Sequence, residues 1–107
     1  MLTKETKKVL YRLYKEYLSR RKADISKAQA ICFGAADSIQ RELFSDWSIS
    51  NLSSALYELS HNKLVSISKY DNKITRCDLT NSAIALMENQ KKDALKSAAD
   101  FVVKFIP

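Results

Sequence analysis

The side chains best suited to metal binding or covalent chemistry in this sequence are two cysteines and one histidine. Cys32 and Cys77 lie far apart in apolar or strand-like stretches, without the paired spacing of a zinc site or a redox motif. We therefore expect two buried, reduced thiols that behave as small hydrophobic residues. His61 is the only histidine, and we expect it at the end of a helix. Because no nucleophile–base pair or pair of carboxylates has a recognisable spacing, we expect no enzyme, metal, cofactor or small-molecule substrate site.

A second group of polar side chains lies in a stretch that is predicted to form a helix from Ser48 or Ser50 to about Asn62. An apolar stripe predicts its buried face and consists of Leu52, Ala55, Leu56 and Leu59. The opposite face carries Ser50, Asn51, Ser54, Glu58 and His61, with Ser53 and Tyr57 on its flank. This face is polar and nearly uncharged. Asn62 tolerates the left-handed backbone that often follows a helix.

Positive charge lies on either side of this helix in the sequence. The formal net charge is +6. Residues 1–22 carry eight Lys or Arg against two Glu, and residues 63–80 carry four against two Asp. The middle of the chain, residues 23–62, carries only two against five acidic residues. A basic balance favours a polyanionic partner, and the cations that would meet it belong to the first helix and to a hairpin.

The length and composition predict one helical domain that spans residues 1–107. A chain of 107 residues is too short for two independent cores. Its 46% hydrophobic content, with one Gly and one Pro, argues against a disordered tail and against a turn-rich β-sandwich. No run of about 18 apolar residues occurs, and the first residues begin a charged amphipathic pattern instead of a signal peptide. We therefore expect a cytoplasmic protein without membrane contact.

The first helix is predicted over about residues 4–21, with Thr3 as its N-cap. Apolar residues recur there every three or four positions. We expect Tyr11, Tyr14 and Tyr17 to make core or dimer contacts. The other faces of this helix carry most of its lysines and arginines.

Two short helices and a turn are predicted next. The first runs through Cys32 and ends at Gly34, the only glycine, in a left-handed C-cap. The second starts at Asp37 or Ser38. The polar stretch around Trp47 then ends it, and we expect Trp47 to be a packing anchor.

A β-hairpin is predicted from two alternating runs, residues 64–70 and 74–79, which Asp71-Asn72-Lys73 separates. Its apolar face consists of Val65, Ile67, Cys77 and Leu79. Three cations lie toward its tip: Lys69, Lys73 and Arg76.

The last helix is predicted over about residues 81–106, with Thr80 or Asn81 as its cap. Its apolar positions are spaced near a heptad and include Ile84, Met87, Leu95, Ala98, Val102 and Phe105. A helix of about 25 residues spans about 38 Å, which exceeds what a domain of this size needs for its own packing. We therefore expect a homodimer that forms through this C-terminal helix.

The order of these elements resembles the winged helix-turn-helix family. Residues 56–65 are similar to the passage from recognition helix to wing in many small bacterial regulators, and residues 79–87 resemble the passage from wing to last helix. Asn62 and Ala83 stand where glycine is common in that family. Nearly the whole chain resembles small uncharacterised winged-helix proteins of Gram-positive bacteria and their mobile elements, through residues 17–18, 33–34, 39–40, 46–48, 57–60 and 79–80. The resemblance implies a mainly α fold with a small β-hairpin, a winged helix-turn-helix with an extended C-terminal helix.

The resemblance also implies that the protein binds double-stranded DNA, as a transcriptional regulator. In a helix-turn-helix the second helix enters the major groove and presents polar residues to base edges. The candidates for base contact are Ser50, Asn51, Ser54 and Tyr57. Asn51 is the first choice, because a carboxamide makes a two-point contact with adenine. The candidates for phosphate or minor-groove contact are Lys69, Lys73 and Arg76, and flanking phosphates are within reach of Lys4, Lys7, Lys8 or Arg12.

Two features favour an alternative function. No Lys or Arg lies between Arg41 and Lys63, and Glu58 falls on the predicted reading face. Since affinity for DNA depends largely on neutralised phosphates, this helix contributes little to it. The alternative is a non-catalytic adaptor or modulator that binds another protein through the same scaffold.

Overall fold

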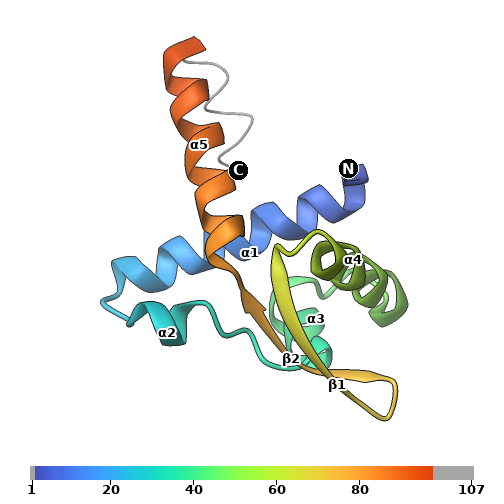
Figure 1. Ribbon diagram of the computed structural model, residues 1–107. Coiled ribbons are helices and arrows are strands. Elements are labelled where there is room, and N and C mark those ends of the chain that lie inside the picture. The colour runs from blue at the N-terminus through green and yellow to red at the C-terminus, as the bar shows by residue number, and fades with distance from the viewer. Residues whose placement is uncertain (1, 98–107) are drawn as a thin grey trace.

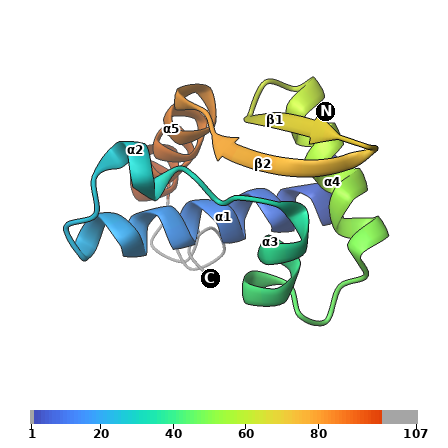
Figure 2. The same cartoon turned by 90° about the horizontal axis from the view of Figure 1, so that it is seen from below.

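The structure is a computed structural model that describes the backbone of residues 2–97 and the side chains of residues 2–90. Over this part of the chain, helices α1 to α5 enclose one hydrophobic core with a two-stranded antiparallel hairpin. Helix α1 crosses the molecule, with α4 near its N-terminal end and α2 near its C-terminal end (Figures 1 and 2). The mainly helical fold with a small hairpin is confirmed, and its helices and strands follow one another in the expected order.

Helix α1 spans Lys4–Lys22, as predicted to within one residue. The Thr3 hydroxyl caps it by accepting a hydrogen bond from the Thr6 N–H at 3.3 Å. At the other end, Asp24 adopts φ 63° and the Ile25 N–H donates to Arg20 O, which together form a Schellman motif. The buried stripe includes Tyr14 and Tyr17, whose rings stack with centroids 6.0 Å apart. These two tyrosines are core residues.

Helix α2 is shorter than predicted and spans only Lys27–Ala30. The expectation of a helix that continues through Cys32 to Gly34 is wrong. The Ile31 carbonyl and the Phe33 N–H instead hydrogen-bond to the second strand of the hairpin, and Cys32 forms a β-bridge with Asp78. Gly34 does have a left-handed backbone, with φ 80°, but it turns this extended segment toward α3 and caps no helix.

Helices α3 (Ala36–Leu43) and α4 (Ile49–His61) form the helix-turn-helix. The cap of α3 was predicted two or three residues too late, at Asp37 or Ser38, because the N-cap is Ala35, which makes no side-chain capping bond. The turn between the helices is held by Gln40 Nε2, which donates to Trp47 O at 2.9 Å. Trp47 is partly buried and packs edge-on against Phe44, with ring centroids 5.3 Å apart, as a packing anchor.

The end of α4 differs from the prediction in one residue. Asn62 keeps φ −90°, and the left-handed residue is Lys63, with φ 62°. The Leu64 N–H donates to Leu59 O and the Lys63 N–H donates to Ser60 O, which places Lys63 at the left-handed position of a Schellman motif. Asn62 instead uses its side-chain amide to bind the Glu58 carbonyl at 2.9 Å.

The hairpin consists of β1 (Val65–Tyr70) and β2 (Lys73–Leu79). Its turn has two residues instead of the three expected, Asp71 and Asn72, both with positive φ as in a type I′ turn. The predicted apolar face is confirmed: Val65 pairs with Leu79 and Ile67 with Cys77, on the side of the core. The register shifts between Ser68 and Lys69, so that Lys69 pairs with Ile74.

Helix α5 spans Asn81–Ser97 and rises away from the body of the molecule (Figure 1). The Thr80 hydroxyl caps it by accepting a hydrogen bond from the Ala83 N–H at 3.1 Å. Ala83, Ile84 and Met87 are buried in the core. The predicted continuation to about residue 106, and with it the remaining apolar positions of the heptad pattern, lies outside the residues whose side chains are described.

Candidate nucleic-acid interface

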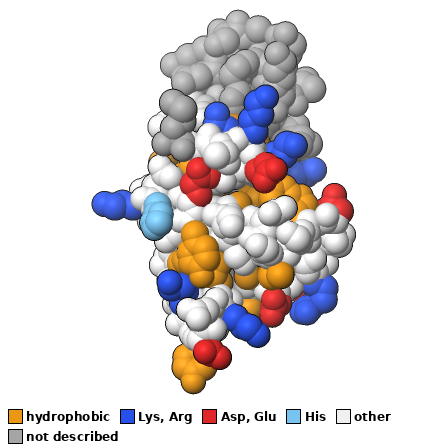
Figure 3. Space-filling view, turned by 90° about the vertical axis from the view of Figure 1, so that its right-hand side faces the viewer, with side chains coloured by type: hydrophobic (Ala, Val, Ile, Leu, Met, Phe, Trp, Pro, Cys, Tyr) orange, Lys and Arg blue, Asp and Glu red, His pale blue; other side chains and the backbone are white. Residues whose placement is uncertain are grey.

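The outer face of α4 is exposed and uncharged at its centre. Ser50, Asn51 and Ser54 are exposed to solvent, and Tyr57 is half-buried. Figure 3 views the molecule from the side on which α4 lies in Figure 1. Uncharged polar groups and backbone, together with several hydrophobic side chains, occupy the middle of this face, and Lys and Arg side chains lie mostly around its margin, interspersed with acidic ones.

A groove of about 490 Å³ separates the outer face of α4 from the start of α1. Asn51, Ser54 and His61 line it from α4, and Thr3 and Thr6 are among the residues that line it from α1. This groove holds three of the four predicted base-contacting residues, Asn51, Ser54 and Tyr57, next to hydroxyl groups, whereas Ser50 lines the cleft beside the hairpin. His61 is exposed at the last turn of α4, as expected.

Glu58 also lines this groove, and its carboxylate is held by α1. The Thr3 hydroxyl donates to Glu58 Oε2 at 3.2 Å. Hydrogen bonds from Thr6 and Thr3 lower the pKa of Glu58 below its usual value. The negative charge of Glu58 therefore lies at the flank of α4 that meets the N-terminus of α1.

The hairpin borders the other flank of α4 with two of the three predicted cations. Lys69 Nζ lies 5.3 Å from the centroid of the Tyr57 ring, within the range of a cation–π contact. Lys73 lines a second cleft, of about 340 Å³, together with Ser50 and Ser53. Both side chains stand beside the candidate base-contacting residues.

The third predicted cation, Arg76, is not brought to this surface. It pairs with Ser68 in the ladder, and its neighbour Cys77 points into the core, so Arg76 projects from the outer face of the hairpin. Its guanidinium there forms an ion pair of 3.1 Å with Asp78. Hydrogen bonding to Asp78 raises the pKa of Arg76 above its usual value.

Of the four candidate cations of α1, Lys8 stands next to α4. It lines a third cleft, of about 240 Å³, with Asp46 and Asn51. Lys4 and Lys7 are exposed on the same end of α1. Arg12 is half-buried and lies 3.7 Å from the Glu16 carboxylate.

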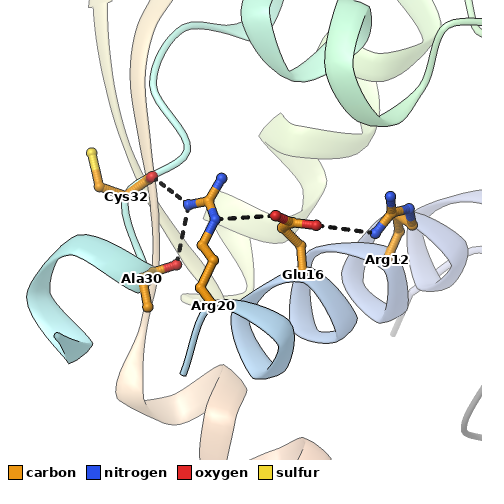
Figure 4. Close-up of polar contacts among 5 residues, drawn as sticks. All are labelled: Arg12, Glu16, Arg20, Ala30 and Cys32. Carbon is orange, nitrogen blue, oxygen red and sulfur yellow. Dashed lines mark hydrogen bonds and ion pairs between the residues drawn. The ribbon is translucent and has the colours of Figure 1, made fainter. Parts of the chain in front are cut away.

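Arg20 belongs to the framework and not to the candidate interface. Its guanidinium donates to Glu16 Oε2 at 3.2 Å, to Cys32 O at 2.9 Å and to Ala30 O at 3.3 Å (Figure 4). It also lies 4.6 Å above the centroid of the Phe33 ring. Arg20 thus fastens the end of α1 to the segment that pairs with β2.

The two thiols differ in burial. Cys77 is fully buried, and this burial raises its pKa to about 12, which leaves it protonated and unreactive at neutral pH. Cys32 is only half-buried, which contradicts the expectation that both thiols are buried. Among the residues that the structure describes, no three His, Cys, Asp or Glu side chains gather closely enough to hold a metal ion.

Comparison of the chain with protein-family models, curated proteins and solved structures found no match. None of the helices in the described part of the chain has the length and apolar character needed to cross a membrane.

Two features of this surface were not foreseen from the sequence. Ile49, the first residue of α4, is 42% exposed beside Ser50. Helical spacing assigns it to the buried stripe, since it precedes Leu52 by three positions, so no sequence signal singled it out. The contact of Glu58 with Thr3 joins residues 55 positions apart and likewise has no local signal.

Proposed function

We propose that this protein binds double-stranded DNA, with α4 in the major groove and the hairpin on the adjacent backbone, and that it acts as a transcriptional regulator. One observation carries the proposal: Asn51 and Ser54 are exposed on a helix that has no Lys or Arg of its own, with Lys8 on one flank and Lys69 and Lys73 on the other. Uncharged donors and acceptors between flanking cations match a base-edge surface between two phosphate backbones.

The charges of this surface set the expected affinity. Since α4 itself carries no cation, Lys8, Lys69 and Lys73 supply the nearest phosphate contacts. Each phosphate contact contributes about −0.9 to the slope of log K against log salt concentration. Three contacts in each subunit therefore give a slope of about −2.7. We expect binding that is weak and strongly favoured by low salt.

The experiment measures binding of the full chain to duplex DNA by fluorescence anisotropy over a series of salt concentrations. The double variant Lys69→Ala, Lys73→Ala should reduce the slope by about 1.8 for each subunit that is bound to the DNA, because each subunit loses two phosphate contacts. The matched control, Lys22→Ala with Lys27→Ala, removes the same charge from exposed positions at the other end of α1 and on α2. It should leave the slope unchanged. Equal slopes for both double variants would refute the placement of the interface.

Asn51→Ala tests base reading separately from phosphate binding. The Asn51 side chain is exposed, so its removal should not affect folding. Loss of a two-point contact should relax the preference at one base pair by about 1–3 kcal/mol and should leave binding to unrelated sequences unchanged. Selection of bound duplexes from a random pool measures this preference. A selected sequence that is the same for both proteins would remove Asn51 from the site.

Homodimerisation through α5 is part of the proposal. Helix α5 projects from the body, and Leu86 on it is 36% exposed. We expect light scattering at tens of micromolar to give the mass of a dimer, and Leu86→Glu to give a monomer. A monomeric mass for the unaltered chain would refute this dimer.

A protein-interaction adaptor is the second candidate function, and the acidic groups Glu5 and Glu58 in the groove beside α4 favour it. Such an adaptor would not bind DNA at low salt in the anisotropy experiment, which distinguishes the two functions.

A further inference from the structure

Ile49 is an exposed apolar side chain at the start of α4. Three large hydrophobic residues are well exposed in the described part of the chain, namely Ile49, Tyr70 and Leu86, and of these Ile49 alone belongs to α4. It occupies the first position of the helix, directly after the N-cap Ser48. In a helix-turn-helix, the N-terminal residues of the second helix are those that contact base edges.

The surroundings of Ile49 restrict what it can contact. It lines the cleft of about 340 Å³ between α4 and the hairpin tip, where Ser50, Ser53, Asn72 and Lys73 supply polar groups. The apolar residues of that cleft, Ala36 and Ile74, are themselves 4% exposed. A protein partner requires a wider apolar patch than one side chain. The major groove offers an isolated apolar group among hydrogen-bonding atoms, the C5-methyl of thymine.

We propose that Ile49 determines sequence specificity by packing against a thymine methyl group, an inference that rests on the proposed DNA binding. Ile49 and Asn51 are two residues apart, so their side chains lie on different flanks of α4: Ile49 lines the cleft beside the hairpin, and Asn51 lines the clefts beside α1. The thymine that Ile49 contacts is therefore read separately from the adenine that Asn51 contacts. The substrate class that results is duplex DNA with a thymine among the bases that face the start of α4.

The experiment isolates the methyl group itself. Duplexes are first selected from a random pool by the full chain, and each thymine of the selected site is then replaced in turn by uracil, which differs only by the missing methyl. We expect one replacement to weaken binding about fourfold. Ile49→Ala should bind the thymine and uracil duplexes equally, whereas the control Lys22→Ala, at the far end of α1, should still distinguish them.

Each outcome has a distinct meaning. If the pool yields no bound duplex, the proposed function fails and the inference fails with it. If duplexes are bound but no uracil replacement weakens binding, or if Ile49→Ala retains the full uracil effect, the methyl contact is refuted while DNA binding stands. Ile49→Val keeps a branched side chain and should retain part of the difference in affinity between the thymine and uracil duplexes. It takes the place of Ile49→Ala in the test if Ile49→Ala does not fold. A change in the mass of DNA-free protein caused by Ile49→Ala would place Ile49 in a protein interface and refute the inference.

Discussion

Replacement of Arg20 by Met should destabilise the fold far more than its surface position indicates. The methionine keeps an apolar stem above Phe33 but removes the hydrogen bonds to the carbonyls of Ala30 and Cys32. Hydrogen bonds from a charged donor contribute about 1.5–3 kcal/mol each. The Arg20 side chain is 22% exposed, so water competes for these carbonyls, and we take the lower end of that range. The expected loss is about 2–3 kcal/mol of unfolding free energy in total.

Urea denaturation followed by far-ultraviolet circular dichroism measures this loss, and the chain provides two matched controls. Arg12→Met removes the other arginine that pairs with Glu16, at 3.7 Å and 38% side-chain exposure, and should lower the unfolding free energy by no more than about 0.5 kcal/mol. Glu16→Gln removes both ion pairs while it leaves the carbonyl bonds of Arg20 in place. If Glu16→Gln proved as destabilising as Arg20→Met, the stabilisation would come from the ion pair and the reasoning would be wrong.

Two further predictions concern the end of α4 and the buried thiol. Lys63→Gly should raise the unfolding free energy by about 0.5–1 kcal/mol, because glycine removes the strain of φ 62°, whereas Asn62→Gly should lower it by about 1 kcal/mol. Urea denaturation of the two variants checks both signs, and stabilisation by Asn62→Gly instead would contradict the observed motif. Burial raises the pKa of Cys77 from 9.0 to about 12, so the folded chain keeps a proton that the unfolded chain releases. The contribution of the Cys77 proton to the unfolding free energy is complete below pH 9. It is lost as the pH rises toward 12, by up to about 1.4 kcal/mol per pH unit. Cys77→Ala should flatten the decline in stability between about pH 9 and about pH 10, and an unchanged decline would contradict the burial argument.

Local sequence signals predicted those elements whose ends are determined by local contacts. Thr3 and Thr80 cap helices through hydroxyl groups that bind N–H groups three residues ahead, a pattern visible in the sequence. The hairpin followed from strict alternation. The short segment after Ala30 was mispredicted because its backbone partners are in β2, more than forty residues later, and no local pattern encodes that pairing.

The sequence predicted those parts of the candidate site that depend on local periodicity, and it did not predict the parts that depend on contacts between distant elements. Helical periodicity correctly placed Asn51 and Ser54 on the exposed face of α4. The three hairpin cations were grouped only because all of them lie toward the tip. Strand alternation would have assigned Arg76 to the opposite face from Lys69, because Arg76 is adjacent to the buried Cys77. The approach of Lys8 to Asn51 depends on how α1 packs against α4, which the sequence does not specify.

The position of the cations, on the flanks of α4 and not on α4 itself, also connects the dimer to DNA binding. One subunit offers about three phosphate contacts and a salt slope of about −2.7, too small a contribution to keep a regulator bound at physiological salt. Two subunits joined through α5 would double that slope to about −5.4 and place two copies of α4 on one duplex. A slope of about −5.4 requires both subunits on the DNA, and Leu86→Glu should then bring the slope to about −2.7. If the slope of Leu86→Glu matched that of the unaltered chain, the contacts to phosphate would be independent of dimerisation, and α5 would have no part in recognition.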